Sequence, residues 1–255
     1  MPPSWAATAL LHPHRKALST QATLPHEDVT IAGDGVVLRG WLFRTGGERR
    51  GTIVYLHGVA DNRASVAGIA ARYVPRGYDV LAYDSRAHGE STGDSCTYGY
   101  FEKGDLTKAI DRLGVAGVAV VGVSMGAAVG LQAAAEDARI QRVVSISTFS
   151  DLRTVARERA PFFASAKNIR DALALAEQQG HFVLDDVSPE RAASRLSIPV
   201  LVVHGASDSD TPPAHSQRVY AALQGPKRLL LLPGAGHSTP LGEDTWKIID
   251  EWLAR

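Results

Sequence analysis

The sequence lacks features that secreted, metal-thiolate and nucleic-acid-binding proteins commonly have. It contains a single cysteine, Cys96, which excludes an intramolecular disulfide and a zinc–thiolate cluster and fits a reducing compartment. Its 27 Lys and Arg residues equal its 27 Asp and Glu residues, and the two signs are interspersed. Because no basic field is present to attract phosphates, we expect no nucleic-acid partner.

Long apolar runs are absent as well. A membrane-spanning helix needs about 18 or more consecutive apolar residues, and every candidate stretch here is interrupted by glycine, proline or charge. The apolar run from Trp5 to Leu11 is short, follows no basic residues and carries no small-residue cleavage pattern, so it does not predict a signal peptide. The sequence therefore predicts a cytoplasmic protein without a membrane span.

The sequence does contain a regular alternation of apolar runs and helical patterns. Residues 35–44 alternate like a half-exposed strand. Near-continuous apolar runs, typical of strands buried on both faces, cover residues 51–58, 78–84, 116–123, 142–147, 199–205 and 227–234. Helical patterns lie between them, at residues 62–75, 101–113, 124–136, 213–223 and 245–253. This alternation predicts an α/β protein: a doubly wound, mostly parallel sheet with flanking helices and right-handed crossovers.

Residues 150–196 depart from this alternation. They have helical patterns at 152–159 and 169–179 but no strong strand, which indicates a short helical cap inserted over one end of the sheet. Neither a composition shift nor an internal repeat marks a second domain. The sequence therefore predicts one domain over residues 1–255, with an N-terminal extension at residues 1–28.

A candidate nucleophile follows one of the buried runs. Residues 122–126 read GVSMG, a G-x-S-x-G motif between an apolar strand and a small-residue helix. Such a turn needs glycine on both sides of Ser124, because strand and helix must approach closely to lift the hydroxyl free of the backbone. The same pattern occurs at residues 89–93 around Ser91, but there it follows a polar stretch and leads into no helix. We therefore predict Ser124 as the nucleophile.

A base and an orienting acid follow downstream. Asp208 and Asp210 come just after the apolar run at 199–205, and His237 lies in the loop after the run at 227–234. In a parallel sheet these strand ends share one edge, where ligands and chemistry gather. The order serine, acid, histidine is that of hydrolases of this doubly wound type. Ser124, Asp208 and His237 are thus the predicted catalytic triad, with Asp210 a competitor for the acid role.

At this point the chain resembles the α/β-hydrolase superfamily from about Val29 to the C-terminus. The motifs that carry the resemblance are His57-Gly58, the turn at residues 84–91, the nucleophile elbow at 122–126, His204-Gly205 with Asp208 and Pro212, and Gly236-His237. The family's acid usually stands four residues before a proline, which favours Asp208 over Asp210. The opening ALLHPHR and the following strand pair look more like the Bem46/ABHD17-like or serine-aminopeptidase-like branch.

The resemblance implies hydrolysis of an acyl bond through an acyl-enzyme intermediate. It also implies an oxyanion hole made by the backbone N–H groups of Val59 and Met125. This chemistry needs no metal and no cofactor. The pair His12 and His14 has no accompanying carboxylate or cysteine, so we interpret it as a solvated terminal segment. His57, His88 and Asp84 are expected to be structural, with Asp84 an alternative acid in principle.

The substrate is expected to be a small acyl compound. Phe162, Phe163 and Phe182 in the predicted cap suit an acyl or aromatic group, although packing of the cap onto the sheet is the favoured interpretation of the same residues. Short to medium carboxylic esters are the main hypothesis. Peptides and acyl thioesters remain alternatives because they use the same triad, as does a catalytically silent binding protein of this fold.

Overall fold

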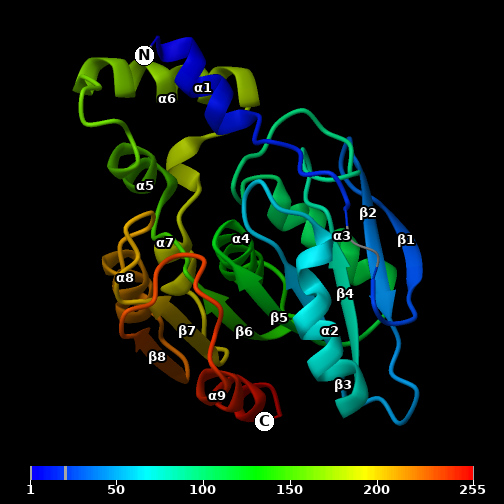
Figure 1. Cartoon of the computed structure of the whole chain (residues 1–255). Coiled ribbons are helices and arrows are strands. Elements are labelled where there is room, and N and C mark those ends of the chain that lie inside the picture. The colour runs from blue at the N-terminus through cyan, green and yellow to red at the C-terminus, as the bar shows by residue number, and fades with distance from the viewer. Residues whose placement is uncertain (1, 20–21, 255) are drawn as a thin grey trace.

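The structure, a computed structural model of the chain, describes residues 2–19 and 22–254 (Figure 1). Residues 1, 20 and 21 of the predicted N-terminal extension, and residue 255 at the end of the predicted domain, lie outside the described residues. The strands are β1 (Glu27–Ala32), β2 (Val37–Phe43), β3 (Gly51–Leu56), β4 (Tyr78–Tyr83), β5 (Val118–Val123), β6 (Ile140–Ile146), β7 (Val200–Gly205) and β8 (Lys227–Leu232). The main helices are α1 (Pro3–Leu11), α2 (Ala67–Tyr73), α3 (Glu102–Leu113), α4 (Met125–Ala134), α5 (Leu152–Glu158), α6 (Ala166–Gly180), α7 (Pro189–Ala193), α8 (Ala214–Ala222) and α9 (Glu243–Ala254).

The strands form one eight-stranded sheet in the order β1-β2-β4-β3-β5-β6-β7-β8. Strands β1 and β2 are antiparallel to their neighbours, whereas β3 to β8 run parallel. The predicted fold class, a mostly parallel sheet with flanking helices, is confirmed. Because the parallel strands end at one edge, the loops after β3, β5, β7 and β8 meet there.

Helices cover both faces of the sheet (Figure 1). On one face α2 and α9 bury Ile69, Tyr73 and Ile249 against strand residues that include Val121 and Val203. On the other face α3, α4 and α8 pack with the remaining strand side chains in a larger apolar cluster. Central strands are therefore buried on both sides, as their continuous apolar runs predict.

Two expectations about the strands need correction. Strand β1 was implied only by the strand pair of the family resemblance and not by an apolar run, because its side chains alternate between buried and exposed in a partly polar sequence, EDVTIA. The run at 227–234 was predicted to be buried on both faces, but β8 lies at the sheet edge and its six residues are only half-buried or exposed. An edge strand has a neighbour on one side only, so an apolar sequence did not ensure burial there.

Residues 150–196 hold α5, α6, the 3₁₀ turn at Leu184–Asp186 and α7. Helix α1, which the sequence did not predict, packs against α6, and the two helices lie side by side in Figure 1. The N-terminal segment thus joins the cap helices above the carboxyl edge of the sheet. Within the described part of the chain, no helix is both long and apolar enough to span a membrane.

Candidate active site

Ser124 lies on a sharp turn between β5 and α4. Its backbone has φ +52° and ψ −113°, a conformation that L-residues rarely adopt. The turn is tight because α4 packs directly against the sheet. A Cβ at Gly126 would lie 2.3 Å from the Leu56 carbonyl oxygen, and one at Gly122 would lie 2.5 Å from the Gly126 backbone. Glycine at both positions therefore permits the close approach that the motif predicts.

His237 lies between Ser124 and Asp208. Its Nε2 is 3.0 Å from Ser124 Oγ, and its Nδ1 is 2.7 Å from Asp208 Oδ2. Because an ionised carboxylate only accepts hydrogen bonds, Nδ1 carries the proton and Nε2 is free to accept one from the serine hydroxyl. The structure thus brings together the three residues predicted as a triad, and it leaves the histidine in the tautomer that a general base requires.

Asp208 is buried and held by the turn that follows it. Its Oδ1 accepts hydrogen bonds from the backbone N–H groups of Asp210 and Thr211, at 3.0 and 2.9 Å. Burial alone would raise the pKa of Asp208, but the hydrogen bonds from Thr211 and His237 outweigh burial and lower it. The carboxylate therefore stays ionised at neutral pH. Asp210 contributes its backbone to this turn, while its own side chain is exposed in the cleft.

A second histidine supports the acid. His204 is fully buried, with Nε2 2.8 Å from the Thr211 carbonyl oxygen and 3.1 Å from Asp208 Oδ2, and Nδ1 2.6 Å from Ser216 Oγ. The Thr211 carbonyl oxygen and the Asp208 carboxylate next to Nε2 are both acceptors, so Nε2 carries the proton. Nδ1 is then an acceptor, and the Ser216 hydroxyl donates to it. Burial lowers the pKa of His204, which keeps the ring neutral. The sequence contained the His204-Gly205 motif, but it did not indicate this supporting role.

The predicted oxyanion donors lie beside Ser124. Gly58, Val59 and Ser124 line the same cleft, and a Cβ at Gly58 would be 3.5 Å from the Ser124 Cβ. Met125 is the first residue of α4, where backbone N–H groups have no partner within the helix and the helix dipole favours negative charge. His57 fixes this loop: its Nδ1 donates to the Gly58 carbonyl oxygen (2.7 Å) and its Nε2 accepts from Ser85 N–H (3.0 Å).

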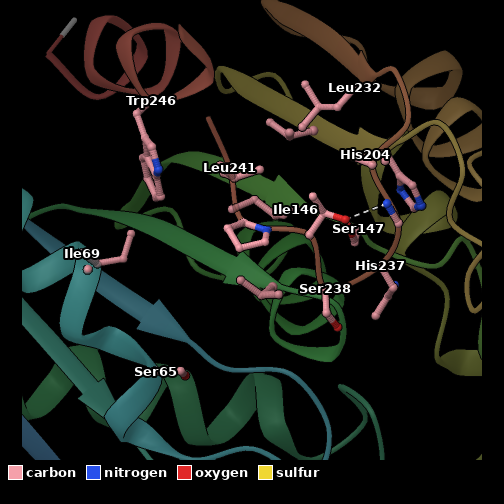
Figure 2. Close-up of a pocket in the computed structure, with 18 of the residues that line it drawn as sticks. Ser65, Ile69, Ile146, Ser147, His204, Leu232, His237, Ser238, Leu241 and Trp246 are labelled. Atoms are coloured by element: carbon pink, nitrogen blue, oxygen red, sulfur yellow. Dashed lines mark hydrogen bonds between the residues drawn. The ribbon is translucent and has the colours of Figure 1, made fainter. Parts of the chain in front are cut away.

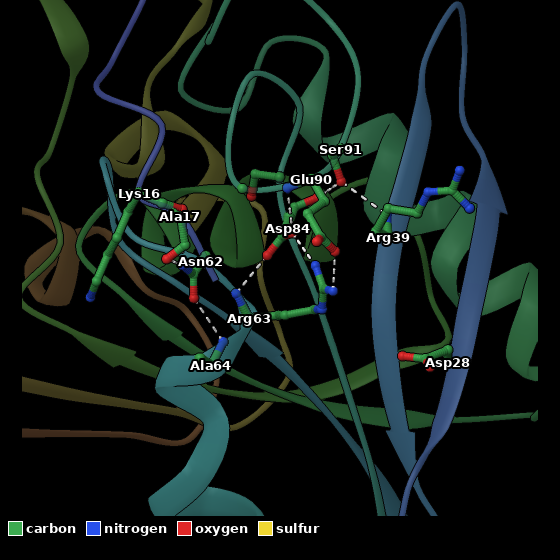
Figure 3. Close-up of polar contacts among 12 residues, drawn as sticks. Lys16, Ala17, Asp28, Arg39, Asn62, Arg63, Ala64, Asp84, Glu90 and Ser91 are labelled. Atoms are coloured by element: carbon green, nitrogen blue, oxygen red, sulfur yellow. Dashed lines mark hydrogen bonds and ion pairs between the residues drawn. The ribbon is translucent and has the colours of Figure 1, made fainter. Parts of the chain in front are cut away.

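The loop after β4 is braced by Asp84 (Figure 3). The Asp84 carboxylate accepts from the backbone N–H groups of Arg63 and Glu90, at 2.7 and 2.9 Å, and also pairs with the Arg63 guanidinium. Ser91, in the second G-x-S-x-G match, is buried; its hydroxyl donates to the Asp84 carbonyl oxygen and accepts from Arg39 N–H. These contacts give Asp84 and Ser91 structural roles, and neither residue lines the cleft that contains Ser124 and His237.

Ser124 opens into a cleft of about 870 Å³ with charged walls. Lys16 enters from the N-terminal segment and pairs with Asp61 at 2.7 Å. Glu158, at the end of α5, lies 2.8 Å from the buried His215. Arg159 donates to the Asp210 carbonyl oxygen (2.8 Å) and to Thr211 Oγ1 (2.6 Å). Sequence reasoning missed Lys16, Glu158 and Arg159, because only the packing of distant segments places them here.

The three phenylalanines predicted to contact substrate do not line this cleft. Phe162 is 100% exposed and Phe163 64% exposed, and their rings contact each other at the end of the cap. Phe182 is buried, with its ring centroid 6.0 Å from that of Tyr100. The prediction of Phe162, Phe163 and Phe182 as substrate contacts was wrong for the Ser124 cleft, because the loop before α6 turns two of them outward and Phe182 packs the cap onto the core.

The fold and the serine turn are those of a hydrolase-like α/β protein, and comparison with known proteins agrees. The alpha/beta hydrolase fold family matches residues 51–183, more than half of the chain, and the chain belongs to this family. The uncharacterized protein Rv2307c of Mycobacterium tuberculosis is 31% identical over 231 residues, covering 87% of this chain and 76% of that protein. The uncharacterized protein YfhR of Salmonella typhi is 26% identical over 257 residues, covering 92% and 82%.

A solved structure is also similar. The esterase Pf2001 of Pyrococcus furiosus superposes with a TM-score of 0.77 at 22% sequence identity, covering 96% of this chain and 97% of that chain. At this level of identity the likeness concerns the fold.

Proposed function

We propose that the protein is a serine hydrolase that cleaves carboxylic esters of short to medium acyl groups through an acyl-enzyme intermediate. The observation that carries the proposal is the position of His237, within hydrogen-bond distance of both Ser124 Oγ and Asp208 Oδ2. A nucleophile, a base and an orienting acid in one chain of hydrogen bonds are the arrangement that activates a serine hydroxyl.

In the proposed mechanism, His237 Nε2 takes the proton of Ser124 as Oγ attacks the acyl carbonyl carbon. Asp208 accepts the hydrogen bond from Nδ1 and stabilises the imidazolium that forms. The imidazolium then gives its proton to the leaving oxygen as the bond between the acyl carbon and that oxygen breaks. Water attacks the acyl-enzyme in a second cycle, again with His237 as the base.

The negative charge that develops on the carbonyl oxygen is assigned to the N–H groups of Val59 and Met125. Both lie in the backbone around Ser124, and the N-terminus of α4 adds a favourable dipole. Removing one such donor in other serine hydrolases costs about 3 kcal/mol of transition-state stabilisation. The tight packing at Gly126 is what holds these two donors in fixed positions.

The similarity of the fold to that of an esterase from Pyrococcus furiosus supports ester hydrolysis among the possible reactions. We further propose that the chain belongs to the Bem46/ABHD17-like or serine-aminopeptidase-like branch, on the strength of its N-terminal sequence. Thioester and amide hydrolysis are the competing activities, because they differ only in the leaving group. A silent binding protein is disfavoured by the intact hydrogen-bond chain from Asp208 to Ser124.

Labelling with a fluorophosphonate probe tests the proposal. We expect a single adduct on Ser124 and loss of activity toward a panel of esters, thioesters and aminoacyl amides. The Ser124→Ala variant is expected to keep its fold and lose at least about a thousandfold in kcat. Ser209→Ala, which removes another serine from the same cleft, is the matched control and keeps its label. An adduct on Ser91, or equal activity in Ser124→Ala, would contradict the assignment.

A further inference from the structure

A second cavity lies beneath the loop that carries His237 (Figure 2). It has a volume of about 210 Å³ and lies on the side of the sheet covered by α2 and α9, between the ends of β6, β7 and β8. Its walls are mainly apolar and include Ile69, Ile146, Val203, Leu232, Leu241 and Trp246. The proposed mechanism uses none of these side chains.

This cavity adjoins the Ser124 cleft. The two share four lining residues, namely Tyr55, Val123, His237 and Ser238. The two spaces therefore adjoin at His237, the residue that receives and returns the proton in the proposed mechanism. The walls of the cleft itself are different in character, since Lys16, Glu158 and Arg159 place charges there.

We propose that the cavity beneath the His237 loop binds the leaving group of the substrate, and that this group is the small apolar alcohol of an ester. The inference rests on the proposed function. His237 must hand its proton to the leaving oxygen, so the alcohol begins at His237, where the two cavities meet. An apolar group gains free energy by leaving water for an apolar cavity, and polar atoms make up a much larger share of the walls of the Ser124 cleft than of this cavity.

The volume sets an upper limit on the alcohol. An apolar protein cavity of about 150 Å³ is large enough to hold benzene, so 210 Å³ accommodates one aromatic ring with a methylene but not a fused pair of rings. The substrate class is thus an ester of a benzyl-sized or smaller apolar alcohol. Trp246, on α9, forms one wall and provides a reporter for occupancy.

Substitutions on β8 test the inference with a matched control. Leu232 lines the cavity, whereas the neighbouring Leu231 is 37% exposed and points to the other side of the strand. In Leu232→Trp we expect the ratio of kcat/KM for benzyl acetate to that for methyl acetate to fall roughly tenfold or more. In Leu231→Trp the ratio stays within about twofold of the original. Trp246→Ala enlarges the cavity and is expected to raise the ratio for naphthylmethyl acetate over benzyl acetate.

A binding measurement separates failure of this inference from failure of the proposed function. Benzyl alcohol, titrated into the ¹⁵N-labelled protein, is expected to shift the indole resonance of Trp246 saturably, with Trp246→Phe identifying the signal. Leu232→Trp should abolish the shift. If no ester is hydrolysed, the proposed function fails, while this titration still decides whether the cavity takes an apolar alcohol.

Two results would overturn the inference. One is an unchanged ratio of kcat/KM for benzyl acetate to that for methyl acetate in Leu232→Trp. The other is that Leu232→Trp alters kcat/KM only across a series of esters that differ in the acyl group and share one leaving group. Should Leu232→Trp not fold, Gly68→Leu replaces it, because Gly68 also lines the cavity and a Cβ there meets no atom within 4 Å. Gly104→Leu on α3, equally unobstructed but outside the cavity, is its control.

Discussion

At the scale of single residues, two neighbouring carboxylates divide the work of one turn. Asp208 is buried and accepts from His237 Nδ1, whereas Asp210 is exposed and offers the turn its backbone N–H and carbonyl oxygen. The sequence left the two in competition and favoured Asp208 from its spacing to Pro212. The contacts of the buried carboxylate supply the physical reason: only Asp208 faces the histidine.

Replacing each aspartate by asparagine tests this division. Asp208→Asn is expected to lower kcat by about 10⁴, because an amide that donates toward Nδ1 favours the wrong imidazole tautomer. Asp210→Asn is the matched control and should change kcat less than about tenfold, since the backbone contacts of residue 210 remain. Ester hydrolysis at saturating substrate measures both. Equal losses would show that the two carboxylates share the role.

At the scale of elements, helix α4 and strand β3 are joined through a contact without side chains. Gly126 lies against the Leu56 and His57 carbonyl oxygens, so α4 contacts the end of β3 and the loop after it backbone to backbone. Gly104, on α3, occupies a helical position with no atom within 4 Å of a Cβ. Gly126 is therefore required for a close backbone approach, whereas Gly104 has room for a side chain.

Alanine substitution should separate these conditions. Gly126→Ala is expected to lower the free energy of unfolding by about 1–3 kcal/mol, because backbone atoms must move to admit the methyl group. The same movement displaces Val59, so kcat is expected to fall more than about tenfold. Gly104→Ala should instead raise the free energy of unfolding by up to about 1 kcal/mol at unchanged kcat. Urea unfolding and ester kinetics on the two variants provide the measurement; similar behaviour of both would refute the argument.

The cap is the second element that bears on function. Its residue Arg159 lines the Ser124 cleft and also an apolar cavity of about 260 Å³ between α1, α5 and α6, which includes Leu10, Ile169 and Leu173. The hydrogen bonds of Arg159 to the Asp210 carbonyl oxygen and Thr211 Oγ1 hold its guanidinium beside the turn that follows Asp208. A long acyl chain that extends from the cleft toward this second apolar cavity therefore passes the charge of Arg159.

A series of p-nitrophenyl esters tests the effect of these walls on the acyl group. We expect kcat/KM to be highest for chains of about two to six carbons, because each further methylene contributes about 0.8 kcal/mol only if it is buried. Arg159→Ala should raise the ratio of long-chain to short-chain kcat/KM, and Arg157→Ala, a change at an exposed position in the last turn of α5 that does not line the cleft, should not. A steady rise of kcat/KM to twelve carbons in the original protein would mean that the cap already holds an acyl tunnel.

At the scale of the whole molecule, the features that could be predicted from the sequence are the strands of the sheet and the residues at their ends. Each central strand has an apolar run that predicts it, and each candidate catalytic residue follows such a strand. Ser124, Asp208 and His237 could therefore be predicted together although 113 positions separate Ser124 from His237. Walls made by distant segments gave no such signal. Lys16 and Arg159 reach the cleft through the packing of α1 on α6 and of α5 over the sheet, and the same packing left Phe162 in solvent.

The core also contains buried titratable side chains. His57, His88, His204 and His215 are fully buried, and burial is the largest cause that lowers the pKa of each of them, that of His57 to about 4. Their hydrogen bonds hold the loops after β3, β4, β6 and β7. Two of these loops, those after β3 and β7, line the Ser124 cleft, so the neutral form of His57 and His204 is a condition of its geometry.

The free energy of unfolding is therefore expected to decrease as the pH is lowered, starting at pH values well above those at which the carboxylates titrate. A lowered histidine pKa in the folded state means that the unfolded chain takes up the proton first, below a reference pKa of about 6.5. The stability contributed by the neutral rings is present above that pH and is lost as pH falls toward the folded pKa, which for His57 is about 4. Each such ring adds at most about 1.4 kcal/mol per pH unit to the slope. Urea unfolding between pH 7.5 and pH 5 should show this decline in the original protein and a shallower decline in His57→Gln. His14→Gln, which changes an exposed ring, should follow the original protein. Identical slopes in all three proteins would show that burial does not lower the pKa of His57.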